Sequence, residues 1–252
     1  MTDTALITGA TAGLGAEFAR QLAADGHRLV LVARDEARLR EKAAALSTEY
    51  GVETEVLPAD LSTEEGIAAV AARLGSEQEP VTLLVNNAGF GLAKWFTDNP
   101  VEDERTHLKV LVQAPMELCH AALTAMQRRG AGRIINVASV AGFLPRGTYS
   151  AAKAWLINFS RWANNFYAPH GIHVTAVCPG FVHTEFHQRM GADMGGVPSW
   201  MWLWPERVVR EGLRDARAGK SVSIPSKRYK VLARIPAVVP EALMTKLASR
   251  GR

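Results

Sequence analysis

The chain has 252 residues, enough for one large α/β domain, and its 48% hydrophobic and 21% charged residues are typical of a globular protein. The formal net charge of +4 is unevenly distributed: residues 220–252 hold eight Lys or Arg and one Glu, which leaves +7 there and −3 elsewhere. The basic excess therefore belongs to the tail, and the charge does not indicate a nucleic-acid partner.

The cysteines and the N-terminus exclude several classes of protein. Cys119 and Cys178 lie in apolar segments outside any Cys/His cluster, so we expect buried thiols, no disulfide framework and no metal site. No basic segment followed by a long apolar stretch opens the chain, and no run reaches about 18 apolar residues. We therefore expect neither a signal peptide nor a transmembrane helix, and a cytoplasmic location.

Short β-rich runs alternate with longer helical patterns. The expected strands are residues 4–8, 28–33, 52–57, 81–86, 133–138, 172–177 and 221–224. The expected helices run to about residue 25, to residue 50, and over 63–74, 100–129 and 149–168. Apolar strands without clean alternation suit a parallel sheet covered on both faces. This order predicts one domain over residues 1–252, a Rossmann-type α/β fold with a doubly wound parallel sheet of about seven strands and helices on both faces.

The first expected strand runs into T-G-A-T-A-G-L-G, residues 8–15, which opens the first helix. Glycines permit a tight turn and the close approach of a pyrophosphate, and the helix N-terminus supplies unpaired N–H groups and a positive dipole end. The segment therefore predicts a dinucleotide site. The residues expected to contact the cofactor here are Gly9, Thr11, Gly13, Leu14 and Gly15.

The end of the second expected strand bears on the choice of cofactor. An acidic residue at this strand tip binds a ribose 2′-hydroxyl, whereas an arginine accommodates a 2′-phosphate. Here Ala33 is followed by Arg34, with Arg38 one turn later, and Asp35 is interpreted as the N-cap of the next helix. The pattern favours NADP(H), with NAD(H) as the less favoured alternative.

Tyr149 and Lys153 are four residues apart in T-Y-S-A-A-K and would share one face of a helix. A phenol near an ammonium loses its proton more easily, so the pair fits a catalytic acid/base, although the spacing alone also fits an ordinary surface pair. Together with further motifs in the same order, the pair resembles the short-chain dehydrogenase/reductase family. The motifs are T-G-x-x-x-G-x-G at 8–15, Asp60-Leu61, N-N-A-G at 86–89, Ser139, Y-x-x-x-K at 149–153 and P-G-x-x-x-T at 179–184.

The resemblance implies a catalytic group of Ser139, Tyr149 and Lys153. Tyr149 would be the acid in carbonyl reduction and the base in alcohol oxidation, and Ser139 would bind the substrate oxygen. Lys153 would lower the Tyr149 pKa and hold the nicotinamide ribose. Asp60 would meet the adenine, and Asn86 would line the cofactor cleft. The resemblance also places these residues against the cofactor: Leu61, Asn87, Ala88, Gly89, Tyr149, Lys153, Pro179, Gly180, Val182 and Thr184. A homodimer or homotetramer is implied by the resemblance alone.

The chain departs from the family pattern at two places. Many members carry V-N-V in the helix before the serine, with an asparagine associated with a water-linked proton relay to the lysine. This chain has V-L-V at 110–112, and Leu111 cannot hydrogen-bond. Either a water or another group relays the proton, or turnover is slower; His107 and Asn158 are nearby in sequence. The second departure is the compact connection of ten residues from Ser139 to Tyr149, shorter than usual.

The variable part of the family pattern gives the substrate expectation. Residues 185–205 would form the substrate lid and are rich in Phe, Met and Trp, which either pack on the core or a partner subunit, or form an apolar pocket. His183 and His187 are interpreted as hydrogen-bonding residues of the lid rather than general acids. The basic C-terminal tail, residues 225–252, is expected to pack over the cleft, with contact to an anionic membrane less favoured.

The sequence thus predicts an NADPH-dependent carbonyl reductase or secondary-alcohol dehydrogenase that acts on an apolar, lipid-, steroid- or aryl-like ketone. Two alternatives stay open at this point. One is a cofactor-binding scaffold or sensor with weak catalysis, and the other is an epimerase or dehalogenase that uses the same site.

Overall fold

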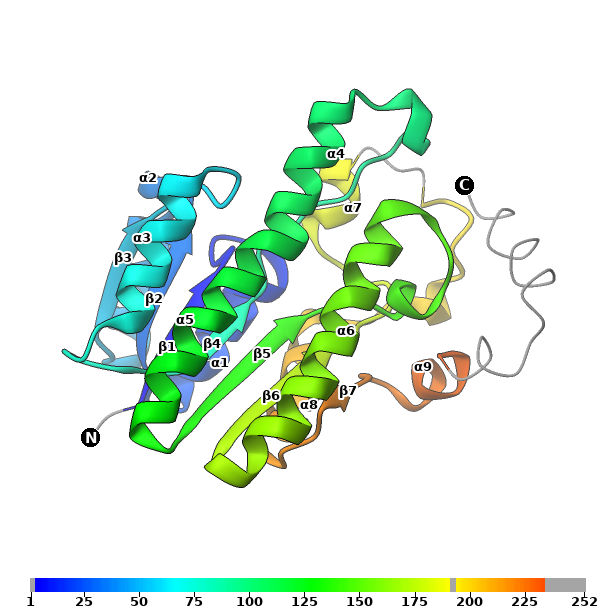
Figure 1. The fold of residues 1–252 in the computed structure, drawn as a ribbon. Helices are drawn as coiled ribbons and strands as arrows, with labels where there is room; N and C mark the ends of the chain where they lie inside the picture. The colour runs from blue at the N-terminus through cyan, green and yellow to red at the C-terminus, as the bar shows by residue number, and fades with distance from the viewer. Residues whose placement is uncertain (1–2, 191–193, 234–252) are drawn as a thin grey trace.

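Figure 1 shows a computed structural model of the chain, which describes residues 3–190 and 194–233. One sheet of seven strands has the order β3-β2-β1-β4-β5-β6-β7, and every neighbouring pair is parallel. The strands are β1 Thr4–Thr8, β2 Arg28–Ala33, β3 Thr54–Pro58, β4 Val81–Asn86, β5 Gly132–Val137, β6 Ile172–Val177 and β7 Val222–Ser223. The strand order reverses between β1 and β4, so the predicted doubly wound Rossmann-type fold is confirmed.

Helices cover both faces of the sheet (Figure 1). The α-helices are α1 Gly13–Ala24, α2 Glu36–Tyr50, α3 Glu64–Gly75, α4 Val101–Leu108, α5 Ala114–Arg129, α6 Gly147–Tyr167, α7 Glu185–Met190, α8 Pro205–Arg217 and α9 Lys227–Leu232. Short 3-10 turns are η1 Phe96–Asp98, η3 Val140–Phe143, η4 Ala168–His170 and η5 Ser199–Met201. Helices α1, α2 and α8 enclose one apolar core with Phe18, and α3, α5 and α6 enclose a second core with Leu118 on the other face.

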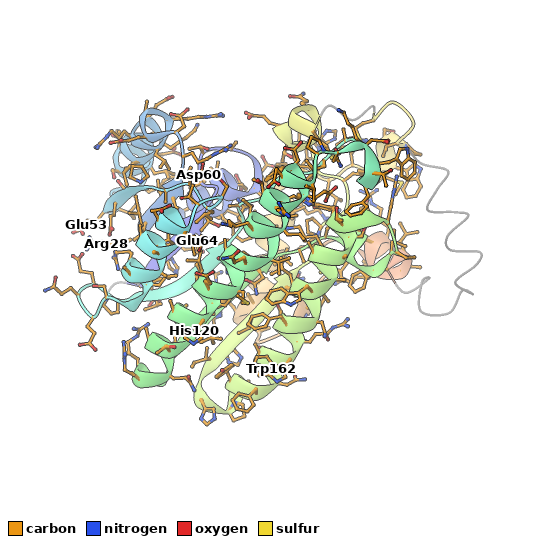
Figure 2. The ribbon with its side chains drawn as sticks, turned by 45° about the horizontal axis from the view of Figure 1, so that its top comes forward. Arg28, Glu53, Asp60, Glu64, His120 and Trp162 are labelled. Atoms are coloured by element: carbon orange, nitrogen blue, oxygen red, sulfur yellow. The ribbon has the colours of Figure 1, made fainter. Side chains whose placement is uncertain are left out.

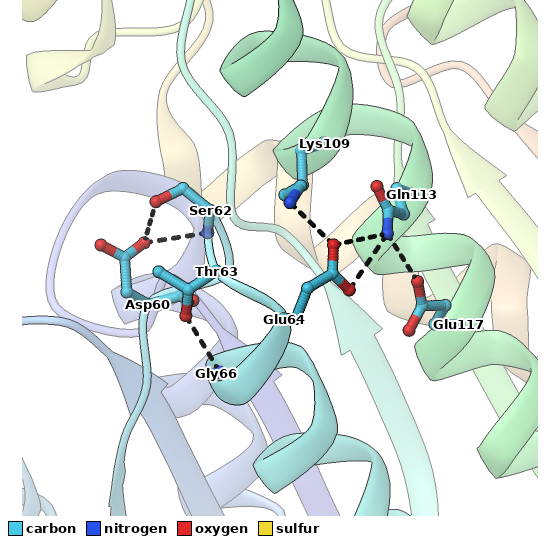
Figure 3. Close-up of polar contacts among 8 residues, drawn as sticks. All are labelled: Asp60, Ser62, Thr63, Glu64, Gly66, Lys109, Gln113 and Glu117. Atoms are coloured by element: carbon cyan, nitrogen blue, oxygen red, sulfur yellow. Dashed lines mark hydrogen bonds and ion pairs between the residues drawn. The ribbon is translucent and has the colours of Figure 1, made fainter.

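The long helix expected over residues 100–129 is interrupted. A π-helical turn, η2 Lys109–Gln113, lies between α4 and α5. On its outer side, Glu64 of α3 accepts hydrogen bonds from Lys109 Nζ at 2.7 Å and Gln113 Nε2 at 3.2 Å (Figure 3). On its inner side lies Leu111, which is 1% exposed. Such π-turns often occur at functional sites, and this one is tied to α3 while it presents Leu111 to the interior.

Other local expectations are met with small shifts in their bounds. The predicted cap is confirmed, because Asp35 Oδ1 accepts a hydrogen bond from Arg38 N at 3.0 Å. Cys119 and Cys178 are buried, free thiols. The last strand, β7, has two residues and is shorter than the expected 221–224. Pro225 follows soon after it and has no N–H to donate to a neighbouring strand. Within residues 3–190 and 194–233, no helix is long and apolar enough to cross a membrane.

Candidate active site

The predicted site residues gather at the carboxyl edge of the sheet. They follow successive strands: Gly9 after β1, Arg34 after β2, Asp60 after β3, Asn87 after β4, Ser139 after β5 and Pro179 after β6. In a parallel sheet these ends all lie on one edge, and the strand order reverses between β1 and β4. Ligands of open α/β sheets bind in the crevice at such a switch point.

The turn after β1 forms a cradle for an anionic group. Gly9 has φ of +68°, a left-handed conformation that glycine adopts without strain, and a Cβ at Gly15 would overlap the Gly9 carbonyl oxygen. The N-cap residue of α1, Ala12, makes no side-chain capping bond, so the amides of the first turn are left for a ligand. Asn87 Nδ2 donates to Thr8 O at 2.9 Å and holds the cradle against β4. This cradle fits the pyrophosphate of a dinucleotide.

Several sequence motifs converge around the cradle. A Cβ at Gly13 would lie 3.3 Å from Thr184 Cβ, and one at Gly9 would lie 3.1 Å from Ala88 Cα. A Cβ at Gly89 would lie 3.8 Å from Lys153 Nζ, so the end of β4 lies next to α6. The remaining predicted positions of the cradle are Thr11 and Leu14, which are half-buried in the same turn. The side chains of Leu61 and Val182 belong to the two cores, so these two residues offer a cofactor their backbones.

Asp60 and Arg34 lie at the neighbouring strand ends, where the adenosine part of a dinucleotide is expected. Asp60 Oδ1 accepts hydrogen bonds from Ser62 N at 2.9 Å and Ser62 Oγ at 2.7 Å (Figure 3). These bonds, together with the positive charge of Arg34, lower the pKa of Asp60 against the opposing effect of burial, which is the largest single influence. Arg34 is exposed, whereas Arg38 forms an ion pair with Glu185 of α7 at 3.0 Å. Arg34 is therefore the cation at this edge that lies open to a ligand phosphate.

Asn86 is buried at the end of β4 and lines a small cavity with Leu111 and Lys153, so its expected place at the cofactor cleft stays a prediction. The residue is 6% exposed, and its Nδ2 donates to Asn136 Oδ1 at 2.9 Å. Its register in the sheet explains this burial: Asn86 of β4 is paired with Asn136 of β5, so that their amides meet inside the domain. Asn86 holds two central strands together behind the site.

Tyr229 of α9 is a residue of the site's frame that the sequence did not reveal. It is 2% exposed, and a Cβ at Gly180 would overlap its ring. Its hydroxyl accepts a hydrogen bond from Phe181 N at 3.1 Å and donates one to Met201 O at 2.7 Å. Gly180 is therefore needed for the close approach of Tyr229, which braces the P-G segment after β6. In sequence, Tyr229 is one aromatic residue in a basic tail whose residues 234–252 lie outside the described part of the chain.

Ser139, Tyr149 and Lys153 come together as predicted. Tyr149 and Lys153 lie one turn apart on α6, with Lys153 Nζ 5.6 Å from the centre of the Tyr149 ring. Lys153 Nζ donates to the carbonyl oxygen of Val137 at 2.8 Å. The Ser139 side chain caps η3, accepts a hydrogen bond from Ala141 N at 3.1 Å, and interacts with the Tyr149 phenol. The compact loop after Ser139 thus keeps all three side chains in one cluster.

The protonation of this cluster differs from the expectation. Burial raises the pKa of Tyr149 to about 12, against a smaller opposing effect of Ser139. Burial also lowers the pKa of Lys153 to about 8. The expected lowering of the Tyr149 pKa by Lys153 is wrong for this structure, because the ammonium is directed to the Val137 carbonyl and the same burial disfavours the phenolate.

Aromatic side chains surround Tyr149. The rings of Phe186 on α7 and His107 on α4 have their centres 5.9 Å and 6.1 Å from the centre of the Tyr149 ring. Of the two polar residues near Leu111 in sequence, His107 is buried in this cluster, whereas Asn158 is exposed on α6. The cluster is therefore apolar apart from His107 and the catalytic group.

In the segment expected to form the lid, Trp200 and Trp204 are 54% and 65% exposed, and its role as a lid stays a prediction. His183 lies against two of its rings, with centres 4.9 Å from Trp202 and 4.5 Å from Trp204. Met190 of α7 reaches Gly91, where its Sδ would overlap an added Cβ. The side chain of His187 lies outside the described residues, so its expected role stays a prediction.

Comparison with known proteins agrees with this geometry. A family model described as short chain dehydrogenase matches residues 3–195. The structure is similar to a short-chain dehydrogenase from Sphingobium yanoikuyae in complex with NADPH, at 34% identity and TM-score 0.86 over 99% of this chain and 96% of that one. It is also similar to the bulky-bulky ketone specific alcohol dehydrogenase from Comamonas testosteroni, at 30% identity and TM-score 0.81 over 95% and 96% of the two chains.

A curated relative is the very-long-chain 3-oxoacyl-CoA reductase of Anas platyrhynchos, 34% identical over 216 residues, which are 83% of this chain and 67% of that protein. Members of the matched family are oxidoreductases that bind NAD(P) and act on CH–OH and C=O groups. The family match spans most of the chain, the sheet has the family's topology, and the side chains predicted to be catalytic meet at the expected edge. The protein belongs to the short-chain dehydrogenase/reductase family.

Proposed function

We propose that the protein is an NADP(H)-dependent carbonyl reductase that acts reversibly on an apolar ketone or secondary alcohol. The observation that carries this proposal is the cluster of Ser139, Tyr149 and Lys153 at the carboxyl edge of the sheet, under the aromatic ring of Phe186. A proton donor, a hydrogen-bond donor and a cation are the groups that carbonyl reduction needs.

Each member of the cluster has a separate task in the proposed reaction. When bound, the cofactor supplies a hydride to the carbonyl carbon. The electron pair of the C=O bond moves to the oxygen, and the Tyr149 hydroxyl donates its proton to that oxygen. The Ser139 hydroxyl donates a hydrogen bond to the same oxygen. Lys153, whose pKa of about 8 keeps most of it protonated at neutral pH, is the cation of the cluster and would hold the nicotinamide ribose. Alcohol oxidation reverses these steps.

The proposed preference for NADP(H) depends on the end of β2. Arg34 is exposed there, and Ala33 brings no carboxylate to repel a 2′-phosphate. Arg38 is half-buried and shared with Glu185, which makes it the secondary partner. The NADPH complex of the Sphingobium yanoikuyae relative supports this choice of cofactor. The pyrophosphate would lie on the cradle of Gly9 and Gly15.

The proposed substrate class is an apolar ketone of lipid-, steroid- or aryl-like shape. Phe186 and Met190 approach the site from α7, and Phe90 packs against His107 with ring centres 5.3 Å apart. Apolar side chains of this kind line pockets for apolar ligands. The Comamonas testosteroni relative is named for bulky ketones and the Anas platyrhynchos relative for a very-long-chain oxoacyl substrate, which supports this class.

The proposal is tested by following NADPH oxidation with a panel of aryl and alkyl ketones. Tyr149→Phe keeps the ring and removes the proton, so we expect turnover to fall by about 10²–10⁴ while NADPH still binds. Tyr167→Phe, the same change at the far end of α6, is the matched control and should retain wild-type activity. Near-full activity of Tyr149→Phe would contradict the mechanism. Cofactor binding without reduction of any ketone would favour the scaffold alternative.

We also propose a homo-oligomer that forms through the outer face of α6. Trp155 stacks on Phe159 with ring centres 5.1 Å apart, and Trp162 continues the row to Phe166 at 5.8 Å. Trp162 is 52% exposed, and Figure 2 shows it on the outer surface of α6. A contiguous aromatic row in which Trp162 and Phe166 are more than half exposed indicates an association surface. Trp162→Lys should reduce the molar mass measured by light scattering, and an unchanged mass would contradict this surface.

A further inference from the structure

His107 is a buried polar side chain that the proposed mechanism does not use. It lies in the last turn of α4 and is 0% exposed. Neither Nδ1 nor Nε2 has a hydrogen-bond partner of standard geometry among the described residues, although the Phe90 carbonyl lies near enough to influence the ring's pKa. A buried imidazole without a well-formed hydrogen bond costs free energy, and native proteins keep few such groups without a reason.

His107 lies in the aromatic cluster around Tyr149, the proposed proton donor. Its ring lies nearly parallel to that of Tyr149, with the centres 6.1 Å apart and an angle of 29° between the planes. The ring of Phe90 packs edge-on against the ring of His107, with the centres 5.3 Å apart. The ring of Phe186 packs against that of Tyr149. His107 is thus a polar side chain outside the catalytic group that lies beside the proposed proton donor.

The charge state of His107 follows from the groups that face it. Burial lowers the pKa of His107, and the positive charge of Lys153 on α6 adds to that effect. Glu104 of α4 and the carbonyl of Phe90 act in the opposite direction. One oxygen of Glu104 accepts a hydrogen bond from Asn99 Nδ2 at 2.9 Å, and Glu104 and His107 make no ion pair within 4.0 Å. His107 is therefore a neutral imidazole at neutral pH, with one N–H donor and one nitrogen acceptor.

Two roles are open to such a group beside Tyr149. A proton relay needs a hydrogen bond from an imidazole nitrogen to the Tyr149 hydroxyl or to Lys153, and Lys153 Nζ instead donates to Val137 O. The face-to-face arrangement of the rings does not aim His107 at the phenol oxygen either. A contact to the substrate needs the ligand to bring a polar atom next to the imidazole, and His107, although buried in this structure, packs directly against the ring of Tyr149 that the substrate must reach.

We propose that His107 is a specificity-determining residue that hydrogen-bonds a second oxygen of the substrate, close to the carbonyl that Tyr149 protonates. The inference rests on the proposed ketone reduction and narrows its substrate class. Because the centres of the two rings are only 6.1 Å apart, the second oxygen must lie close to the reacting carbonyl and not at the far end of a long substrate. The favoured substrates are therefore apolar ketones with an ester, carbonyl or hydroxyl oxygen two or three atoms from the reacting carbon, and simple ketones leave the imidazole unpaired.

A matched pair of ketones tests this role. Ethyl benzoylacetate and hexanophenone have the same phenyl ketone and equal chain length, but only the first has ester oxygens near the carbonyl. In the wild-type protein, kcat/KM should favour the keto ester by about 10–100-fold. In His107→Leu the ratio of the two kcat/KM values should fall toward one, mainly because KM for the keto ester rises. Reduction of hexanophenone should be retained. His107→Gln keeps a donor and an acceptor and should restore part of the ratio.

Two results would overturn the inference. One is an unchanged ratio in His107→Leu. The other is an equal loss on both ketones together with a shifted pH–rate profile, which would make His107 a proton relay. Calorimetric binding of the two ketones in the presence of NADP⁺ measures the same discrimination without turnover. Failure to reduce either ketone contradicts the proposed function, whereas loss of the binding preference in the wild-type protein contradicts the role of His107.

Discussion

Leu111→Asn restores the polar residue that many relatives carry at this position and tests what the leucine does here. Leu111 is 1% exposed on the inner side of the π-turn. Its Cδ2 lies 2.8 Å from the position of an added Cβ at Gly89, and Lys153 Nζ lies 3.8 Å from the same position. An asparagine at 111 would therefore bring an amide into the neighbourhood of the catalytic lysine.

The size of the effect follows from the space behind Leu111. A cavity of about 10 Å³ is lined by Leu111, Lys153 and Asn86, among other residues. This volume is at the lower limit for one water molecule. A buried amide with too few partners costs about 1–3 kcal/mol, and for a domain of this length each kcal/mol shifts Tm by about 2–4 °C. Asn86 Oδ1, which has no hydrogen-bond partner among the described residues, can offset part of the cost.

The assay measures Tm, cofactor affinity and the pH–rate profile on the same variant. If the missing asparagine limits proton supply, Leu111→Asn should alter turnover or its pH profile and leave cofactor affinity unchanged. An amide oxygen that binds the ammonium directly or through a water favours the charged form, so the limb that reports Lys153, with its pKa of about 8, should move to higher pH. Leu123→Asn, a buried α5 site away from the cavity, is the matched control for stability alone. A lower Tm with an unchanged pH–rate profile would refute the missing relay.

Four further substitutions test the surrounding groups. Arg34→Ala should raise KM for NADPH far more than for NADH, and Ala33→Asp should move the preference further toward NADH; a wild-type preference for NADH would contradict this reading. Lys153→Met should abolish turnover yet stabilise the fold at neutral pH, because burial lowers the Lys153 pKa from 10.5 to about 8. Between pH 8 and pH 10.5 the unfolded chain binds more protons than the folded one, so the free energy of unfolding of the wild-type protein should rise with pH, by up to about 3 kcal/mol. Denaturation experiments on Lys153→Met should not show this rise. Tyr229→Phe should lower Tm because the Phe181 amide and the Met201 carbonyl lose their shared partner; an unchanged Tm would show that water replaces the hydroxyl.

Much of the fold and the site could be predicted because local patterns determine them. Apolar runs mark the parallel strands, and the glycines after β1 mark a turn that a Cβ would block. The pairing of Tyr149 with Lys153 needs only one helical turn. These features depend on residues close in sequence, so the pattern and the structure agree.

The features that the sequence did not reveal depend on contacts between distant elements. The π-turn at Leu111 has the same apolar pattern as an ordinary α-helix, and its ties to Glu64 come from α3. The pKa of Tyr149 is set by burial under α4 and α7, which its spacing from Lys153 does not report. In the sequence, His107 does not differ from the other polar residues of a charged helix. Its position beside Tyr149 follows only from the fold.

The most direct test of the proposed function is hydride transfer from labelled cofactor. Wild-type protein is incubated with NADPH deuterated at the transferable position and with hexanophenone or ethyl benzoylacetate, and the products are analysed by mass spectrometry. Reduction through Ser139, Tyr149 and Lys153 predicts a secondary alcohol that carries one deuterium on the carbinol carbon, and a Tyr149→Phe variant that forms about 10²–10⁴ times less of it. Alcohol without the label, or no alcohol from any ketone of the panel while NADPH binds, would contradict the proposed carbonyl reductase.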